Sequence, residues 1–270
     1  MLCYAADEHM YKAVLFDLDD TLIAQDASDE ASLRAVCAYA SELRSIDAPT
    51  LHGAARRHAA GLWRAAPTFA YADRIGIGYT EGMWARFTGD SPDLNALRAW
   101  APAYRRAAWS GALREQDVDD APLAEEMAAL FEEERRNCRA VYPDAEPALR
   151  DLREECRLGL VTNGAPDLQR EKLEQSGLGH FFDAVVVSGE VDIGKPDPRI
   201  FALALERLGV RPSEAVMVGD NPARDIAGAQ RAGLKTVFIQ RPDLERDLSG
   251  ITPDAHIVDL DQLRPALSRL

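Results

Sequence analysis

Three short apolar runs, far apart in the chain, each end at a carboxylate or hydroxyl side chain. The first run leads into Asp17 and Asp19, the second into Thr162 and the third into Asp220. Apolar runs without polar alternation are typical of parallel strands that helices cover on both faces. Because open parallel sheets bind ligands beyond the carboxyl ends of their strands, we expect these four side chains to meet at one edge of a single sheet.

The strand and helix pattern after residue 141 is that of an α/β protein. One strand is predicted early, at residues 12–16, and the others are predicted at 158–162, 184–188, 215–219 and 236–240. Helical periodicity lies before and between these later strands, at 146–156, 167–176, 198–208 and 223–232. Such alternation is typical of βαβ units. We therefore predict a doubly wound, Rossmann-like parallel sheet.

A long helical stretch separates the first predicted strand from the rest of its sheet. Breaks that contain proline divide this stretch into amphipathic segments, predicted at 30–46, 51–65, 71–87, 93–106 and 122–139. We therefore predict an all-helical cap domain at 23–140, inserted into an α/β core domain made of residues 11–22 and 141–270. Residues 1–10 are expected to form an N-terminal extension.

The net charge and the cysteine content limit the kinds of binding partner and of cellular compartment that we expect for this protein. The 270 residues carry a net charge of −14, which disfavours nucleic acid and anionic membranes, because both bind basic surfaces. The chain shows neither a secretory signal nor an apolar run long enough to cross a membrane. Cys3, Cys37, Cys138 and Cys156 lack paired C-x-x-C spacing, so free thiols in a reducing compartment are expected. We predict a cytoplasmic protein with a small-molecule ligand; nothing in the sequence indicates its oligomeric state.

The acidic side chains at the predicted sheet edge require a cation. Asp17, Asp19, Asp220 and Asp225 cannot share a small cleft as anions unless positive charge neutralises them. A set of oxygen ligands suits Mg²⁺, which favours carboxylates, water and phosphate oxygens. The sequence therefore predicts a magnesium site that also receives a phosphate group.

Lys195 stands directly before a predicted helix start. Asp197 has the character of an N-cap and Pro198 that of a first helical residue. A lysine beside a helix N-terminus is an arrangement that binds phosphate. Each motif also has a purely structural explanation, with Thr162-Asn163 as a helix-capping turn and Lys195 as a surface lysine. Their order at successive strand ends, with a spacing compatible with βα units, favours one shared functional site.

Together these motifs resemble those of the haloacid dehalogenase-like hydrolases, in the phosphatase branch with a helical cap. The matching segments are 14–22, 160–163, Lys195 in Gly-Lys-Pro-Asp-Pro, and Gly219-Asp220 with Asp225. The resemblance covers residues from about 11 to 240, although the insert matches only in being helical. Asn221-Pro222 departs from the serine-led form that is common in the fourth motif.

The resemblance implies a Mg²⁺-dependent phosphomonoesterase that hydrolyses a small soluble phosphate ester through an aspartyl phosphate. The implied catalytic residues are Asp17 as nucleophile, Asp19 as general acid and base, Thr162, Asn163 and Lys195. The implied metal ligands are Asp17, Asp19, in part through its backbone, and Asp220, with Asp225 in support. Electrostatic stabilisation of this kind is most of what phosphoryl transfer requires of a protein.

Three alternatives stay open on the sequence. A 2-haloacid dehalogenase releases halide, which needs no proton, and such family members usually lack an acid where this chain has Asp19. A phosphomutase or phosphotransferase would keep both aspartates of the first motif, so the motif does not separate it from a hydrolase. A catalytically silent binding protein on the same fold is disfavoured by the intact Asp17 and Asp19.

The insert is expected to set the substrate preference, because the motif residues meet only the phosphate, the metal and the ester oxygen. Its four tryptophans are expected to pack between helices, and its paired arginines, at 56–57, 105–106 and 135–136, to lie on solvated helix faces. The sequence does not rank sugar phosphates, nucleoside monophosphates and phosphoglycolate as substrates.

Overall fold

The computed structural model describes residues 11–138, 140–242 and 244–270. They form two compact units. The first holds the described residues up to Ala24, together with Val141–Asn163 and Leu173–Leu270, and the second holds Gln25–Ala140 and Gly164–Lys172. We propose that these units are the α/β core and the helical insert expected from the sequence.

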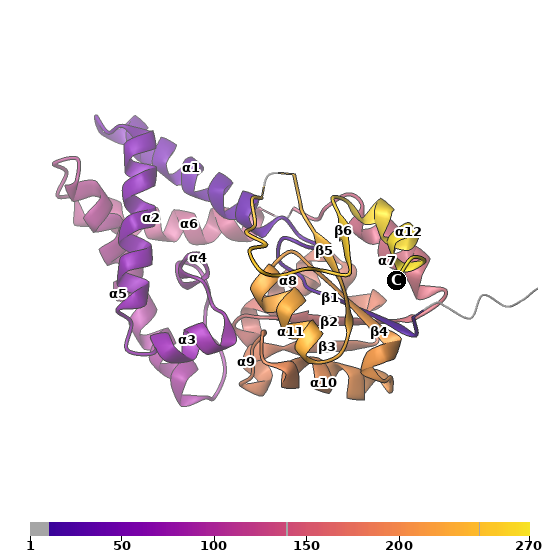
Figure 1. Cartoon of the computed structure of the whole chain (residues 1–270). Coiled ribbons are helices and arrows are strands. Elements are labelled where there is room, and N and C mark those ends of the chain that lie inside the picture. The colour runs from indigo at the N-terminus through magenta and orange to yellow at the C-terminus, as the bar shows by residue number, and fades with distance from the viewer. Residues whose placement is uncertain (1–10, 139, 243) are drawn as a thin grey trace, which may run out of the picture. The chain divides into compact units, whose positions relative to one another are not determined.

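The first unit is built on one parallel sheet of six strands in the order β3-β2-β1-β4-β5-β6 (Figure 1). The strands are β1 (Ala13–Phe16), β2 (Arg157–Thr162), β3 (Ala184–Val187), β4 (Ala215–Gly219), β5 (Lys235–Ile239) and β6 (Ala255–Ile257). The first five lie within one residue of their predicted bounds. The short strand β6 was not predicted, because its central residue is His256 and three residues carry too little apolar pattern. The predicted doubly wound fold is confirmed.

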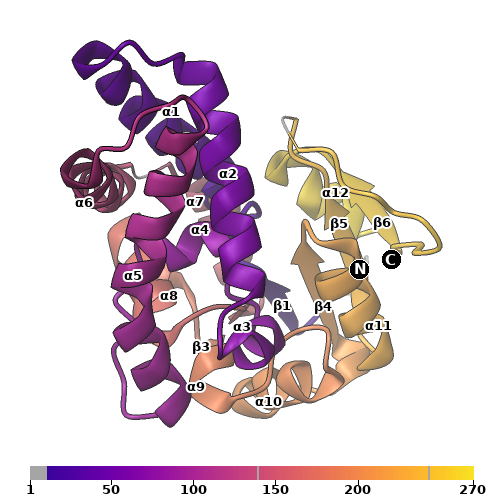
Figure 2. The same cartoon turned by 90° about the vertical axis from the view of Figure 1, so that its left-hand side faces the viewer.

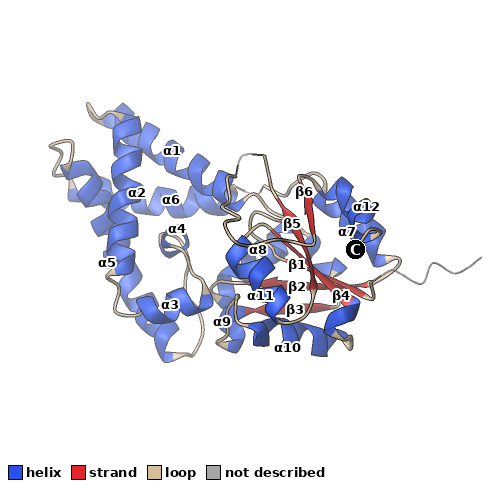
Figure 3. Ribbon diagram, in the orientation of Figure 1, coloured by secondary structure: helices blue, strands red, loops and turns tan. Residues whose placement is uncertain are grey.

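Helices cover both faces of the sheet (Figure 3), which explains why β1, β3 and β4 are apolar throughout and why β2 and β5 are largely apolar. Val14 and Phe16 of β1 face the core shared with α7 (Ala145–Arg153) and α12 (Leu263–Leu267). Ala13 and Leu15, on the opposite face, pack with α10 (Pro198–Leu208) and α11 (Ala227–Arg231). Helix α8 (Pro166–Ser176) follows β2, and the short helix α9 (Ser188–Val191) follows β3.

The chain leaves the sheet after β1 and returns to it at the same place. Ile23 forms an isolated antiparallel bridge with Val141, and the backbone N–H of Tyr142 donates to the carbonyl of Leu22 at 3.0 Å. A long insertion therefore interrupts the α/β unit without separating β1 from its neighbours. Asp17 and its partners can reach one sheet edge although the insert lies between them in the sequence.

The second unit is helical. Its helices are α1 (Gln25–Leu43), α2 (Ala48–Arg64), α3 (Phe69–Ile75), α4 (Tyr79–Gly82), α5 (Pro92–Arg114) and α6 (Ala121–Asn137), and α2 runs along α5 (Figure 2). The helix predicted at 71–87 is in fact two short ones, because Gly76 ends α3 in the left-handed conformation, with φ of 81°. Helix α5 continues past its predicted end, since Trp109 and Ala112 extend its buried face. Arg139, at the predicted end of the last segment, lies outside the described residues.

The four tryptophans pack inside this unit, as predicted. Trp63, Trp84 and Trp109 are buried, and Trp100 packs against the same core. The ring of Trp63 lies 5.5 Å from that of Tyr104, measured between centroids. These contacts make the tryptophans part of the hydrophobic core of the insert.

The expectation of solvated arginine pairs is correct for Arg56, Arg57 and Arg106 but wrong for Arg105, Arg135 and Arg136, which are covered and paired with carboxylates. The guanidinium of Arg135 is buried, donates to the carboxylate of Asp29 and to Gln25, and lies 4.8 Å from the ring centroid of Trp84. Arg105 is also largely covered and donates to Glu132 at 2.9 Å. Both arginines sit on inner faces of packed helices, where a charge is tolerated because a carboxylate pairs with it.

Among the described residues, none of the helices combines the length and the apolar character that a membrane crossing needs.

Replacing Arg135 with alanine should destabilise the protein by about 3–5 kcal/mol, because the substitution leaves the Asp29 carboxylate buried without its counter-charge. Urea unfolding measures the loss. Arg34→Ala is the matched control: it removes an exposed i,i+4 pair with Glu30, so its effect should be close to the experimental error. Equal losses in the two variants would contradict the structural role of the buried pair.

Candidate active site

The candidate site lies at the point where the strand order of the sheet reverses. Strand β1 pairs with β2 on one side and with β4 on the other, so successive βα units leave it in opposite directions. Asp17 follows β1 directly, and its backbone N–H donates to the carbonyl of Val218 in β4 at 3.0 Å. Asp220 follows β4. Such a switch point opens a crevice at the carboxyl ends of the strands, where α/β proteins bind their ligands.

Three carboxylates meet in this place. One oxygen of Asp17, one of Asp220 and one of Asp225 all lie within 4.8 Å of one another, and all three residues are buried. Asp225 reaches the group from a π-helical turn, Pro222–Ile226, in which the backbone N–H of Asn221 donates to Asp225 Oδ2 at 2.9 Å. π-Helical turns are rare in proteins, and those that do occur often lie at functional sites.

Gly219 makes room for this arrangement. A Cβ atom at this position would lie 2.4 Å from Asp225 Oδ2 and 2.5 Å from its carboxyl carbon, which is closer than real side chains approach. Any larger residue here would therefore push the Asp225 carboxylate out of the group.

Lys195 is buried between two of the carboxylates. Its Nζ lies 2.5 Å from Asp17 Oδ1 and 2.7 Å from Asp225 Oδ1. Asn163 fixes the lysine backbone from both sides: its amide nitrogen donates to the carbonyl of Lys195 at 2.9 Å, and its amide oxygen accepts from the N–H of Lys195 at 2.8 Å. The predicted cap is also present, because Asp197 accepts from the backbone N–H of Arg199 at 3.0 Å.

Thr162 is buried at the end of β2, level with Val187 of β3. Asp19 follows Asp17 by two residues and is partly exposed, and its carboxylate does not belong to the group of three. The structure thus brings together Asp17, Asp220, Asp225 and Lys195 of the predicted site. Asn163 also lies at the site, where its amide binds the backbone of Lys195.

Burial dominates the electrostatics of the site. It raises the pKa of Asp17 to about 7, with Lys195 acting in the opposite direction and Asp225 adding to the increase. Burial, together with Asp225 and Asp17, also raises the pKa of Asp220 well above its usual range. Burial alone would lower the pKa of Lys195, but Asp17 and Asp225 outweigh it and raise that pKa. Three acids around one lysine leave excess negative charge, which a bound cation would offset.

Arg246 is a member of this neighbourhood that sequence reasoning missed. Its Nε lies 2.9 Å from Asp220 Oδ2, and its Nη2 lies 3.0 Å from Asp20 Oδ2. It belongs to no motif, and its segment shows no periodicity that would set it apart from the other basic residues of the chain.

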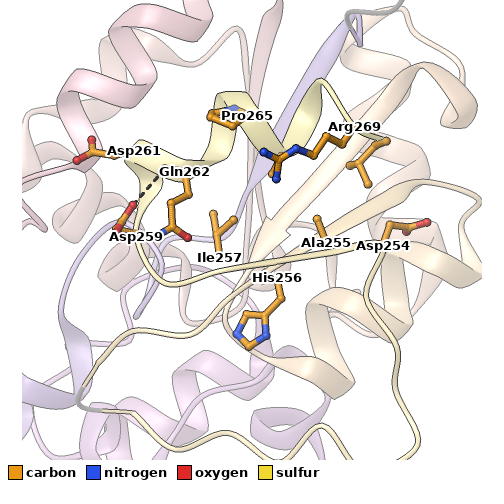
Figure 4. A pocket seen from close by; sticks show the side chains of 11 residues that line it. Asp254, Ala255, His256, Ile257, Asp259, Asp261, Gln262, Pro265 and Arg269 are labelled. Atoms are coloured by element: carbon orange, nitrogen blue, oxygen red, sulfur yellow. Dashed lines mark hydrogen bonds between the residues drawn. The ribbon is translucent and has the colours of Figure 1, made fainter.

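A separate cavity of about 660 Å³ lies between β6 and the C-terminal helix α12. Figure 4 shows Asp259 and Gln262 at its rim, joined by a hydrogen bond, with His256 below them. None of its lining residues is a motif residue, so this cavity is not the candidate active site.

Replacing Gly219 with alanine should destabilise the protein by about 1–3 kcal/mol, because the added methyl group overlaps the buried Asp225 carboxylate. Urea unfolding measures the change. Gly61→Ala is the control, since its Cβ would meet no atom within 4 Å and helix α2 should gain about 0.5–1 kcal/mol from the better helix former. A Gly219→Ala variant as stable as the wild type would contradict the close packing at Asp225.

Comparisons with known proteins identify the family of this chain. The family model for haloacid dehalogenase-like hydrolases matches residues 11–233. A phosphoserine phosphatase of Thermus thermophilus is 42% identical over 254 residues, which cover 93% of this chain and 97% of that protein. A glyceraldehyde 3-phosphate phosphatase of Methanopyrus kandleri is 48% identical over 120 residues, which cover 43% of this chain and 52% of the relative.

Among solved structures, the putative hydrolase YfnB of Bacillus subtilis, described as bound to magnesium, has a TM-score of 0.66 at 23% identity. The match covers 96% of this chain and 99% of that one, and at this identity it shows the fold alone. The family model and the relative that is matched almost end to end carry the conclusion. This chain belongs to the haloacid dehalogenase-like hydrolase family.

Proposed function

We propose that this protein is a Mg²⁺-dependent phosphatase that transfers the phosphoryl group of a small ester to Asp17 and then to water. The hydrolase class follows from the family, and the phosphoric monoester hydrolase class follows from the nearly full-length relative. One observation carries the site assignment: Asp17 is buried beside both Lys195 and the carboxylates of Asp220 and Asp225.

The residues at the site fit a magnesium ion. Their ligand atoms are carboxylate oxygens, the hard donors that Mg²⁺ prefers, and they lie close enough to share one ion. Asp17 and Asp220 would hold the metal together with the backbone at residues 18–19, and Asp225 would support it. When bound, the metal would neutralise charge on the transferred group. The carboxylate of Asp19 lies outside the group of three, which favours a role in proton transfer rather than as a side-chain ligand.

The chain's own groups then perform the chemistry. Asp17 attacks phosphorus and forms an acyl phosphate, which divides one difficult displacement into two easier ones. Asp19 gives a proton to the departing oxygen and later takes one from the attacking water. Lys195 offsets the phosphoryl charge, together with the buried hydroxyl of Thr162 at the end of β2.

Asn163 has a supporting role in this proposal. Both ends of its amide bind the backbone of Lys195, so it holds the lysine in place rather than contacting the phosphate. Because the ammonium group is already in place, it needs little reorganisation during the reaction. Preorganised charges lower the activation barrier in this way.

The substrate we propose is phosphoserine or a close analogue. This substrate is supported by the match to the phosphoserine phosphatase of Thermus thermophilus, which covers 97% of that protein. The relative from Methanopyrus kandleri matches over about half of its own length, so its substrate carries less weight. The cytoplasmic location stays a prediction from the sequence.

Asp17→Asn should lower phosphatase turnover by at least about a thousandfold, equivalent to about 4 kcal/mol in the barrier, because an amide oxygen is a poor nucleophile. Phosphate release measures the rate, and thermal unfolding checks that the variant is folded. Asp151→Asn, a change of the same kind at an exposed aspartate on α7, is the control and should keep full activity. Activity above about a tenth of the wild-type level would exclude Asp17 as the nucleophile.

Chelation of divalent metal should abolish the activity, and added Mg²⁺ should restore it. Ca²⁺ should not restore it, because the larger ion takes more ligands and disturbs the in-line geometry of the displacement. The measurement is phosphate release after dialysis against a chelator and readdition of one metal at a time. Full activity in excess chelator would rule out the metal-dependent reaction.

In a panel of phosphorylated metabolites, L-phosphoserine should show the highest kcat/KM and release free inorganic phosphate. Transfer to a second hydroxyl without phosphate release would instead identify a phosphomutase or phosphotransferase. Halide release from a 2-haloacid, with no turnover of any phosphate ester, would identify a dehalogenase. A folded protein that turns over none of these compounds would favour a binding protein.

A further inference from the structure

Arg246 places a second cation at the carboxylate cluster, paired with different acids from those that Lys195 contacts. Its guanidinium contacts Asp220 at 2.9 Å and Asp20 at 3.0 Å, while Lys195 contacts Asp17 and Asp225. The side chains of Asp20 and Asp220 are 6% and 5% exposed, whereas that of Arg246 is 27% exposed. The arginine therefore covers two buried acids from the solvent side.

This contact compensates charge that would otherwise be costly. A buried carboxylate without a partner strongly destabilises a protein, so the acids of the site need positive charge even before a metal is bound. Lys195 supplies one charge to Asp17 and Asp225, and Arg246 supplies another to Asp220 and Asp20. Each of the two cations therefore pairs with its own two carboxylates.

A divalent cation and the guanidinium of Arg246 would compete for the carboxylate of Asp220. Arg246 Nε bonds to Asp220 Oδ2, and the same carboxylate is one of the three that can hold an ion. Two cations that share one carboxylate lie a few ångströms apart, and their repulsion is only weakly screened in a buried site. Arg246 can yield more readily than Lys195, because it is partly exposed while the lysine is enclosed.

Arg246 lies between β5 and β6, in a segment whose described residues form neither helix nor strand. Ion pairs hold the two ends of this segment: Arg241 pairs with Asp144 at 2.6 Å, and Asp254 pairs with Lys235 at 2.6 Å. The guanidinium of Arg246 is thus carried by a loop and not by a helix or strand of the core.

We propose that Arg246 is the counter-cation of the metal-free site and that it leaves Asp220 when a divalent metal binds. This inference rests on the proposed function, since it concerns the same metal site. Arg246 then lowers the metal affinity, because its positive charge opposes a second cation at the same carboxylate. In return it stabilises the metal-free protein.

The test is Mg²⁺ binding by isothermal titration calorimetry on the full chain after removal of metal with a chelator. Arg246→Gln should bind Mg²⁺ at least about tenfold more tightly than the wild type, because the competing charge is gone. Arg246→Lys keeps the charge and should stay close to the wild type. Arg264→Gln is the matched control: it removes the same charge from an arginine that pairs with Asp151 and Glu155, and its affinity should be unchanged.

Thermal unfolding gives a second readout that does not depend on activity. Without metal, Arg246→Gln should unfold at a lower temperature than Arg264→Gln, and saturating Mg²⁺ should remove the difference. If Arg246→Gln binds Mg²⁺ equally or more weakly than the wild type, Arg246 orients Asp220 instead and the proposal is overturned. If neither the wild type nor the variant binds Mg²⁺, the metal site of the proposed function fails and this role fails with it.

Discussion

The ion pairs of Lys195 with Asp17 and Asp225 are the interaction on which the rest of the site depends. They join the ends of β1 and of the π-helical turn after β4 through a lysine that precedes α10. A buried ammonium between two buried carboxylates is stable only if all three groups are held in place. Asn163, Gly219 and the turn at Asn221 supply that support through backbone hydrogen bonds and close packing.

The parallel sheet explains why so few local features are needed to assemble this cluster. Each strand delivers the first residue after its carboxyl end to the same edge, so Asp17 and Asp220 become neighbours although about two hundred residues separate them. The bridge between Ile23 and Val141 lets the insert leave and return without disturbing β1.

The site holds more carboxylates than basic side chains, and this excess of negative charge bears on both its stability and its proposed reaction. Asp17 has a pKa raised to about 7 by burial, and the pKa of Asp220 is raised as well, so the metal-free site is electrostatically unfavourable to its own ionised acids. Positive charge relieves this, whether it comes from Lys195, from Arg246 or from a bound metal. The positive charges that a phosphoryl group requires are also those that compensate the buried acids of the site.

The sequence by itself determined the strands β1 to β5, the residues at their ends and the cap at Asp197, because apolar runs and capping residues act within a few neighbours in the chain. Only the tertiary structure decided which of the 31 lysine and arginine residues pair with buried acids. Arg135 with Asp29 in the insert and Arg246 with Asp220 at the sheet edge were decided in this way. It likewise placed the amide of Asn163 against the backbone of Lys195 and left the Asp19 carboxylate out of the group of three. Such pairings depend on how elements that are distant in the sequence pack together. The residues around a long, flexible side chain do not indicate which acid it will pair with.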